Sequence, residues 1–131
     1  MTIQSQLTSC AGSLSQAGGL AALTKVTETE MESNVKIMKE KRDYVVKRLS
    51  NISGLKYFVP DGAFYILPDV SAWFGGDDTE FCLALLKEKA LALVPGSSFG
   101  ADGTVRLSYA TSIEELTVAM DKLEAFMEEK R

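Results

Sequence analysis

The chain has 131 residues, which suits one domain, and its 46% apolar and 24% charged side chains are typical of a soluble globular protein. A net charge of −4 argues against nucleic acid and anionic membranes as partners. The sequence contains no histidine, so the commonest general base and metal ligand are missing, and we expect no metal site. Cys10 and Cys82 lie far apart and predict a reduced, cytoplasmic protein.

Residues 11–23 predict a helix that is weak in isolation. Almost all of its residues are small, and Thr8 or Ser9 can cap its start. Gly18 and Gly19 each cost about 1 kcal/mol relative to alanine in a helix interior. We therefore expect this helix to form only where it packs against another surface.

Residues 27–51 predict a long amphipathic helix. Thr27 and Glu30 have the spacing of a capping box at its start. Apolar residues recur at helical spacing, namely Met31, Val35, Met38, Val45 and Leu49. Such length is unusual for so small a domain and suggests that the helix also meets a partner.

The rest of the chain predicts short strands and two further helices. Strands are expected at residues 55–60, 63–70, 91–94 and 105–109. Asp77 or Asp78 can cap a helix that runs to about Lys89, and Ser112 with Glu115 forms a second capping box. The predicted fold class is α+β, a short sheet of about four strands packed on helices, with the long amphipathic helix at the N-terminal side.

Arg106 lies in the middle of a predicted strand, where a cation is unusual. Strand alternation puts Arg106 and Ser108 on one face and three apolar residues on the other, Val105, Leu107 and Tyr109. Burying an unpaired guanidinium is costly, so it must reach water, a carboxylate or a ligand. Two interpretations stay open from the residues alone. Arg106 is either a solvated or structurally paired arginine, or a bidentate clamp for a substrate carboxylate.

Four segments of the chain resemble a known family in order and spacing. They are Gln4-Ser5-Gln6-Leu7-Thr8-Ser9, Pro60-Asp61-Gly62-Ala63-Phe64-Tyr65, Val94-Pro95-Gly96-Ser97-Ser98-Phe99-Gly100 and Val105-Arg106-Leu107-Ser108-Tyr109-Ala110. Together they resemble the C-terminal, small-domain part of a fold-type I aminotransferase dependent on pyridoxal phosphate, in the aspartate aminotransferase (class I and II) family. The resemblance implies that residues 1–26 are the tail of a large domain and residues 27–131 a small domain.

The resemblance also implies roles for three residues. Arg106 matches the arginine that binds the substrate α-carboxylate, and Gly62 and Phe64 are expected to line the same cleft. It implies a full-length enzyme that uses pyridoxal phosphate to move an amino group between an amino acid, of the aspartate or glutamate type, or prephenate, and a 2-oxo acid. A homodimer is implied for that enzyme, in the cytoplasm or in an organelle if a transit peptide precedes it.

The family's cofactor-binding lysine has no counterpart in a matching motif of this chain. We therefore expect no catalytic, cofactor-binding or metal-binding residue here, and an inactive fragment that does not bind pyridoxal phosphate specifically. Met1 is then expected to be an internal start or the start of a truncated gene. Two alternatives remain: a stand-alone regulatory α/β module that binds a carboxylate, and an interaction subunit that pairs through its two N-terminal helices.

Overall fold

The computed structural model describes residues 3, 6–7 and 10–131, which divide into two units, Met1–Lys36 and Ile37–Arg131. Thr8 and Ser9, the expected caps of the first helix, lie outside the described residues, but this helix begins at Ser13 with Gly12 in the N-cap position and no side-chain hydrogen bond there, so the predicted cap is wrong. Within the described part, no helix is both long enough and apolar enough to cross a membrane.

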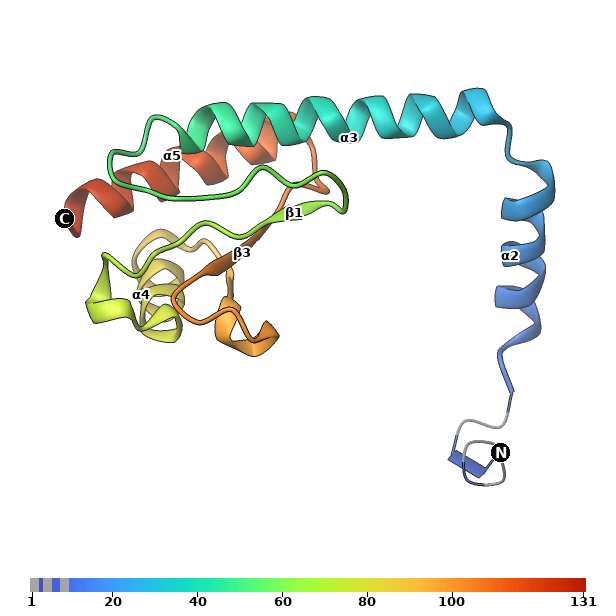
Figure 1. Ribbon diagram of the computed structural model, residues 1–131, viewed down its shortest axis with the longest axis horizontal. Helices are drawn as coiled ribbons and strands as arrows, with labels where there is room; N and C mark the ends of the chain where they lie inside the picture. Colours follow the sequence, from blue (N-terminus) through green and yellow to red (C-terminus); the bar gives the residue numbers. More distant parts are fainter. Residues whose placement is uncertain (1–2, 4–5, 8–9) are drawn as a thin grey trace. The chain divides into compact units, whose positions relative to one another are not determined.

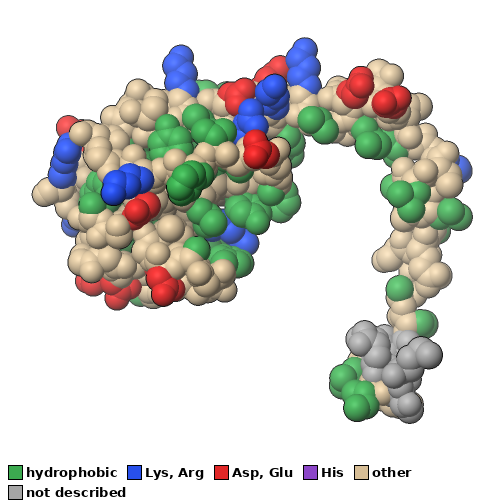
Figure 2. All heavy atoms as spheres, viewed as in Figure 1, with side chains coloured by type: hydrophobic (Ala, Val, Ile, Leu, Met, Phe, Trp, Pro, Cys, Tyr) green, Lys and Arg blue, Asp and Glu red, His purple; other side chains and the backbone are tan. Residues whose placement is uncertain are grey.

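The first unit contains α2 (Ser13–Lys25) and the start of α3 (Glu28–Leu49). None of the residues of α2 is buried, and its three leucines are exposed. Figure 2 shows several hydrophobic side chains exposed at the surface of the molecule. The capping box predicted for α3 is confirmed. The Thr27 amide donates to the Glu30 carboxylate (2.8 Å), and the Glu30 amide donates to the Thr27 hydroxyl (3.3 Å).

The second unit is built on a three-stranded antiparallel sheet, of order β1-β3-β2 (Figure 1). The strands are β1 (Tyr65–Ile66), β2 (Val94–Pro95) and β3 (Val105–Ser108). The prediction of α+β is confirmed, but about four strands were expected. The missing strand is residues 55–60, which pair with the rest through one bridge between Lys56 and Asp69. Pro60 is the last residue of the first segment and Pro68 lies inside the second, and neither has an N–H to donate to a strand pair.

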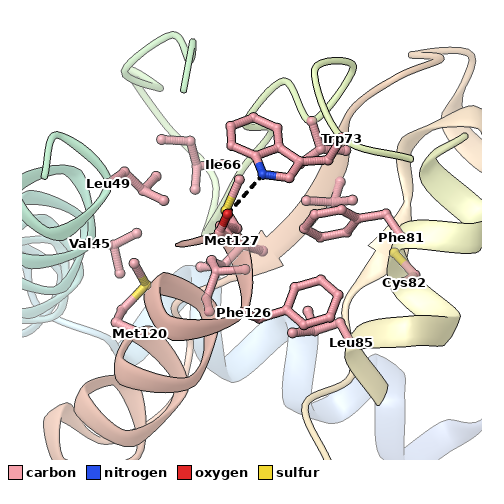
Figure 3. Close-up of a cluster of buried hydrophobic side chains, with 14 of the residues drawn as sticks. Val45, Leu49, Ile66, Trp73, Phe81, Cys82, Leu85, Met120, Phe126 and Met127 are labelled. Atoms are coloured by element: carbon pink, nitrogen blue, oxygen red, sulfur yellow. Dashed lines mark hydrogen bonds between the residues drawn. The ribbon is translucent and has the colours of Figure 1, made fainter. Parts of the chain in front are cut away.

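One face of the sheet carries the hydrophobic core. The predicted alternation is confirmed, since Val105, Leu107 and Tyr109 are all buried. This face is covered by apolar residues of α5 (Ile113–Glu129), and Phe126 of α5 contacts Phe81 edge to face, with ring centroids 5.4 Å apart. The Trp73 indole donates to the backbone carbonyl of Met127 (3.0 Å), which closes the core at this end (Figure 3).

The C-terminal half of α3 is fixed to α5 by an ion-pair cluster around Arg48. The Arg48 guanidinium lies 2.7 Å from the Glu124 carboxylate and 2.6 Å from that of Asp121. These hydrogen bonds, that to Glu124 first, raise the pKa of Arg48 further above its already high value. Val45 and Leu49 are buried beside this cluster, while Met31 and Val35 of the same predicted apolar face are exposed.

Two consecutive aspartates stand at the start of helix α4 (Asp78–Lys89) and make different hydrogen bonds. Asp77 is the cap, as one of the two predicted candidates, and accepts hydrogen bonds from the amides of Thr79 (3.0 Å) and Glu80 (2.9 Å). Asp78 is only 4% exposed, and its carboxylate faces the segment that joins β2 to β3. It therefore fastens the start of α4 to that segment.

The segment that joins β2 to β3, residues 96–103, is called the 96–103 loop below. It begins with the 3₁₀ helix η2 (Gly96–Phe99) and ends in a turn at Gly103. The Gly96 amide donates to the Thr104 carbonyl (2.8 Å), so the two ends of the loop meet. A Cβ on Gly96 would overlap the Thr104 hydroxyl and lie 2.5 Å from the Ala101 carbonyl oxygen, and Gly100 and Gly103 both have a φ of +73°.

We predict that Gly96→Ala destabilises the protein by about 1–3 kcal/mol or more, because the added methyl must push backbone atoms apart. Gly62→Ala is the matched control. A Cβ at position 62 meets no atom within 4 Å, and its φ is not positive, so the change should stay within about 0.5 kcal/mol. Urea unfolding of the two variants measures both values, and equal losses would contradict the close packing at Gly96.

A second prediction concerns pH. Burial by itself raises the pKa of the Asp78 carboxyl, but the hydrogen bonds from the Ser97 hydroxyl, the Ser97 amide and the Gly103 amide outweigh it, so its pKa lies below the ordinary value. Because the folded-state pKa is lowered, the stability from ionised Asp78 is present above the unfolded-state pKa of about 4 and is lost as the pH falls through the folded-state value.

Asp78→Asn should therefore lower the free energy of unfolding by about 1–3 kcal/mol at pH 7, the usual worth of hydrogen bonds to a charged group. The difference in free energy of unfolding between wild type and variant should become smaller below about pH 4, where the wild-type carboxylate is itself neutralised. Urea unfolding across this pH range measures the difference, and a constant difference from pH 7 to pH 3 would contradict the assignment.

Candidate functional site

Arg106 lies on the face of the sheet that points away from the core. It is paired in register with Val94 of the neighbouring strand, and the next pair on this face is Tyr65 with Ser108. Arg106 is half-buried, in contrast to its buried neighbours Val105 and Leu107. The strand therefore holds the arginine backbone rigidly from the core side and leaves the side chain on the outer face.

Two aromatic rings flank the Arg106 guanidinium. Its central carbon lies 4.4 Å from the ring centroid of Phe99 and 5.7 Å from that of Tyr65. At these distances each ring attracts the cation electrostatically. Phe99 comes from the 96–103 loop and Tyr65 from β1, so elements on both sides of β3 set the position of the arginine.

The guanidinium has no carboxylate partner among the described residues. The ion pairs of that part of the chain involve Arg42, Arg48, Lys89 and Lys130 but not Arg106. No hydrogen bond joins its nitrogens to any other described residue. Ring faces bind the plane of a guanidinium and leave its N–H groups at the edge free. Within this part of the chain, the arrangement can bind a planar anion through two parallel hydrogen bonds.

Gly62 and Phe64 lie in the turn that leads into β1. Phe64 is 53% exposed, so it is not a core residue, and its ring contacts Tyr65 edge to face with centroids 5.8 Å apart. Gly62 is exposed and has ordinary backbone angles, whereas Ala63 carries the positive φ of the turn, at 63°. The structure thus joins Phe64 to Arg106 only through Tyr65. The expected role of Gly62 beside a ligand stays a prediction.

A groove of about 620 Å³ lies beside the arginine. Its walls come from the segment 91–94, from β3 and from α5, and they include Leu91, Val94, Arg106, Ser108, Val118 and Lys122. The groove therefore runs between the 91–94 segment, β3 and α5, with Arg106 among its lining residues. Besides its apolar side chains, the groove is lined by two cations, Arg106 and Lys122, and by two carboxylates, Glu114 and Glu115.

Sequence reasoning missed Phe99, Tyr65 and Asp78 as parts of the site. Phe99 and Tyr65 both stand in segments that carry the family resemblance, so their positions in those segments were a usable signal. Asp78 was considered only as a helix cap. Its contacts with residues about 20 positions away along the chain leave no trace in local spacing.

The described residues provide little else for chemistry. No group of three or more Cys, Asp or Glu side chains lies close enough there to hold a metal ion. Burial raises the pKa of the Cys82 thiol to about 11, which keeps it protonated and a poor nucleophile. None of the lysines is buried, although a lysine that forms a Schiff base needs a desolvated environment. The residues present do not fit pyridoxal phosphate, and we assign none of them to it.

A family model and curated relatives both match this chain to aminotransferases. The family model for aminotransferases of class I and II matches residues 2–123. An aspartate aminotransferase of Thermotoga maritima is 46% identical over 125 residues, 95% of this chain, and one of Pinus pinaster is 40% identical over 133 residues, 93% of this chain. The chain spans only 31% and 27% of the length of these relatives.

Solved structures agree. The crystal structure of the aspartate aminotransferase from Thermotoga maritima matches 97% of this chain and 32% of its own with a TM-score of 0.79 at 46% identity. An alanine aminotransferase from Pyrococcus furiosus matches 92% of this chain and 31% of its own with a TM-score of 0.83 at 37% identity. Because the family model covers residues 2–123, nearly all of the chain, the chain belongs to the class I and II aminotransferase family.

Proposed function

We propose that the chain is the C-terminal part of a pyridoxal-phosphate-dependent aminotransferase that moves an amino group between an amino acid and a 2-oxo acid. The observation that carries this proposal is the Arg106 guanidinium, which lies between two rings with no carboxylate partner among the described residues. Several relatives are named aspartate aminotransferases, which supports an amino acid of the aspartate or glutamate type as one substrate.

Arg106 binds the substrate α-carboxylate. Its planar fork of N–H donors matches the two carboxylate oxygens, so one arginine fixes both the position and the plane of the substrate. The rings of Phe99 and Tyr65 lie beside the guanidinium, where each attracts the cation and helps to hold it in place. When bound elsewhere in the enzyme, pyridoxal phosphate supplies the electron sink for the reaction.

Gly62 and Phe64 belong to the same proposal. The exposed Phe64 ring, in contact with Tyr65, is placed to line the cleft beyond the arginine. Gly62 leaves the turn free of side-chain bulk where substrate enters. We further propose that residues 1–26 belong to the large domain and residues 27–131 to the small domain, and that the whole enzyme is a cytoplasmic homodimer.

The relatives' names favour this function over the two alternatives, a carboxylate-binding regulatory module and an interaction subunit. Of the three functions, only the aminotransferase accounts for the match of its family model to residues 2–123.

In the full-length enzyme, we predict that Arg106→Ala lowers kcat/KM for every amino acid and 2-oxo acid substrate alike, since all of them carry the α-carboxylate. The loss should be on the order of 2–5 kcal/mol of transition-state binding, and Arg106→Lys should recover little because it lacks the planar fork. Steady-state kinetics with several substrates measure the loss, and thermal unfolding of the same variants should show a much smaller effect.

Arg131→Ala is the control, because it removes the same charge from an exposed position at the end of the chain. It should leave kcat/KM unchanged. If Arg106→Ala instead unfolds the protein while each folded molecule keeps its activity, Arg106 is a structural residue and the proposed function loses its main support.

A further inference from the structure

The ring of Phe99 has little to hold it in place except its own backbone. Phe99 is 52% exposed, so the core does not fix it, yet its centroid lies 4.4 Å from the Arg106 guanidinium carbon. The position of this ring therefore depends on the conformation of the 96–103 loop. Whatever fixes that loop also fixes one face of the arginine.

The carboxylate of Asp78 binds the loop at both ends. One oxygen accepts hydrogen bonds from the Ser97 amide (3.0 Å) and the Gly103 amide (3.1 Å), and the other accepts from the Ser97 hydroxyl (2.8 Å). Ser97 lies at the start of the loop and Gly103 at its end, so a single side chain closes it. Phe99 sits between the two attachment points.

The Asp78 carboxylate is also buried and hydrogen-bonded. Asp78 is 4% exposed and is the one charged residue in the buried set of the described chain. A buried carboxylate is costly unless it is fully hydrogen-bonded, and here three donors from the loop supply that bonding. Within the loop, the Ala101 amide donates to the Gly96 carbonyl (3.0 Å), which keeps the turn closed around the carboxylate.

We propose that Asp78 is a positioning residue for Arg106. By holding Ser97 and Gly103 together, it places the Phe99 ring against the guanidinium and so sets the plane in which Arg106 meets a carboxylate. This inference rests on the proposed function of Arg106 as the carboxylate-binding residue. The hydrogen bonds of the Asp78 carboxylate to described residues go to Ser97, Gly103 and Thr79, not to Arg106, so its effect passes through the loop.

Asp77 provides a matched control. It is the neighbouring aspartate and caps the same helix, accepting from the amides of Thr79 and Glu80, but it makes no hydrogen bond to the loop among the described residues. Asp77→Ala should lower the Tm by weakening α4 and leave KM unchanged. A residue that acts only through stability would behave like Asp77.

The experiment compares Asp78→Asn, Asp78→Ala and Asp77→Ala in the full-length enzyme loaded with its cofactor. We expect both Asp78 variants to raise KM for the amino acid and the 2-oxo acid about tenfold, with kcat changed less than about threefold, because a misplaced guanidinium weakens carboxylate binding. Asp78→Asn keeps the side-chain shape and serves if Asp78→Ala does not fold.

Two further readouts test the route through the loop. Hydrogen exchange measured by mass spectrometry should speed up in peptides covering residues 96–103 of the Asp78 variants but not of Asp77→Ala. Phe99→Leu should raise KM by itself, and adding Asp78→Ala to it should raise KM no further, because both changes remove the same ring contact.

Additive effects of Phe99→Leu and Asp78→Ala on KM, or an equal rise of KM in Asp77→Ala, would overturn the proposal. So would unchanged KM in both Asp78 variants. The Arg106→Ala enzyme distinguishes the two levels of inference. If Arg106→Ala lowers kcat/KM for all substrates and the Asp78 variants leave KM unchanged, only the positioning role fails. If Arg106→Ala leaves kcat/KM unchanged in the folded enzyme, the proposed function fails, and the positioning role fails with it.

Discussion

A guanidinium on the middle strand of a small sheet has to remain charged and accessible while the opposite face of the same strand is fully buried. The fold meets this constraint by alternation, since Val105 and Leu107 anchor β3 in the core and Arg106 faces outward. The anchor is strong because Phe126 and its neighbours on α5 fill the core beneath it. Rigid backbone under a charged side chain is what a precise carboxylate clamp requires.

The aromatic contacts complete the arrangement. An ion pair within the chain would occupy the N–H donors of Arg106, whereas the rings of Phe99 and Tyr65 attract the cation without accepting a conventional hydrogen bond from it. The two rings come from opposite neighbours of β3, one from β1 and one from the 96–103 loop. No described residue neutralises the cation, so among those residues its N–H donors stay available for an anion.

The second unit owes its cohesion to polar contacts as well as to its core. Arg48 joins α3 to α5 through Glu124 and Asp121, and Asp78 joins α4 to the 96–103 loop. Both link elements that are distant along the chain. The first unit is different. Every residue of α2 lies outside the buried set, in keeping with the glycine pair and small side chains that make this helix weak without a surface to pack on.

Local sequence determined the helices, and it determined the starts of α3 and α4. The capping box at Thr27 and Glu30 and the cap at Asp77 depend on residues three or fewer positions apart, and alternation around Arg106 needs only five. The family resemblance likewise pointed to Arg106. The strand count was less accessible, because residues 55–60 have the composition of a strand and only their pairing, limited to one bridge, excludes them from the sheet.

Tertiary structure alone decided how Arg106 is held. Phe99, Tyr65 and Asp78 meet the site across 7 to 41 positions of sequence, and nothing in the local pattern of any of them specifies that contact. Asp78 has the sequence signature of a helix cap whether its carboxylate is buried or exposed. Its burial depends on how closely the 96–103 loop approaches, which the glycines at 96, 100 and 103 permit. Spacing along the chain fixes hydrogen bonds within a turn, whereas contacts between elements follow from how their faces pack.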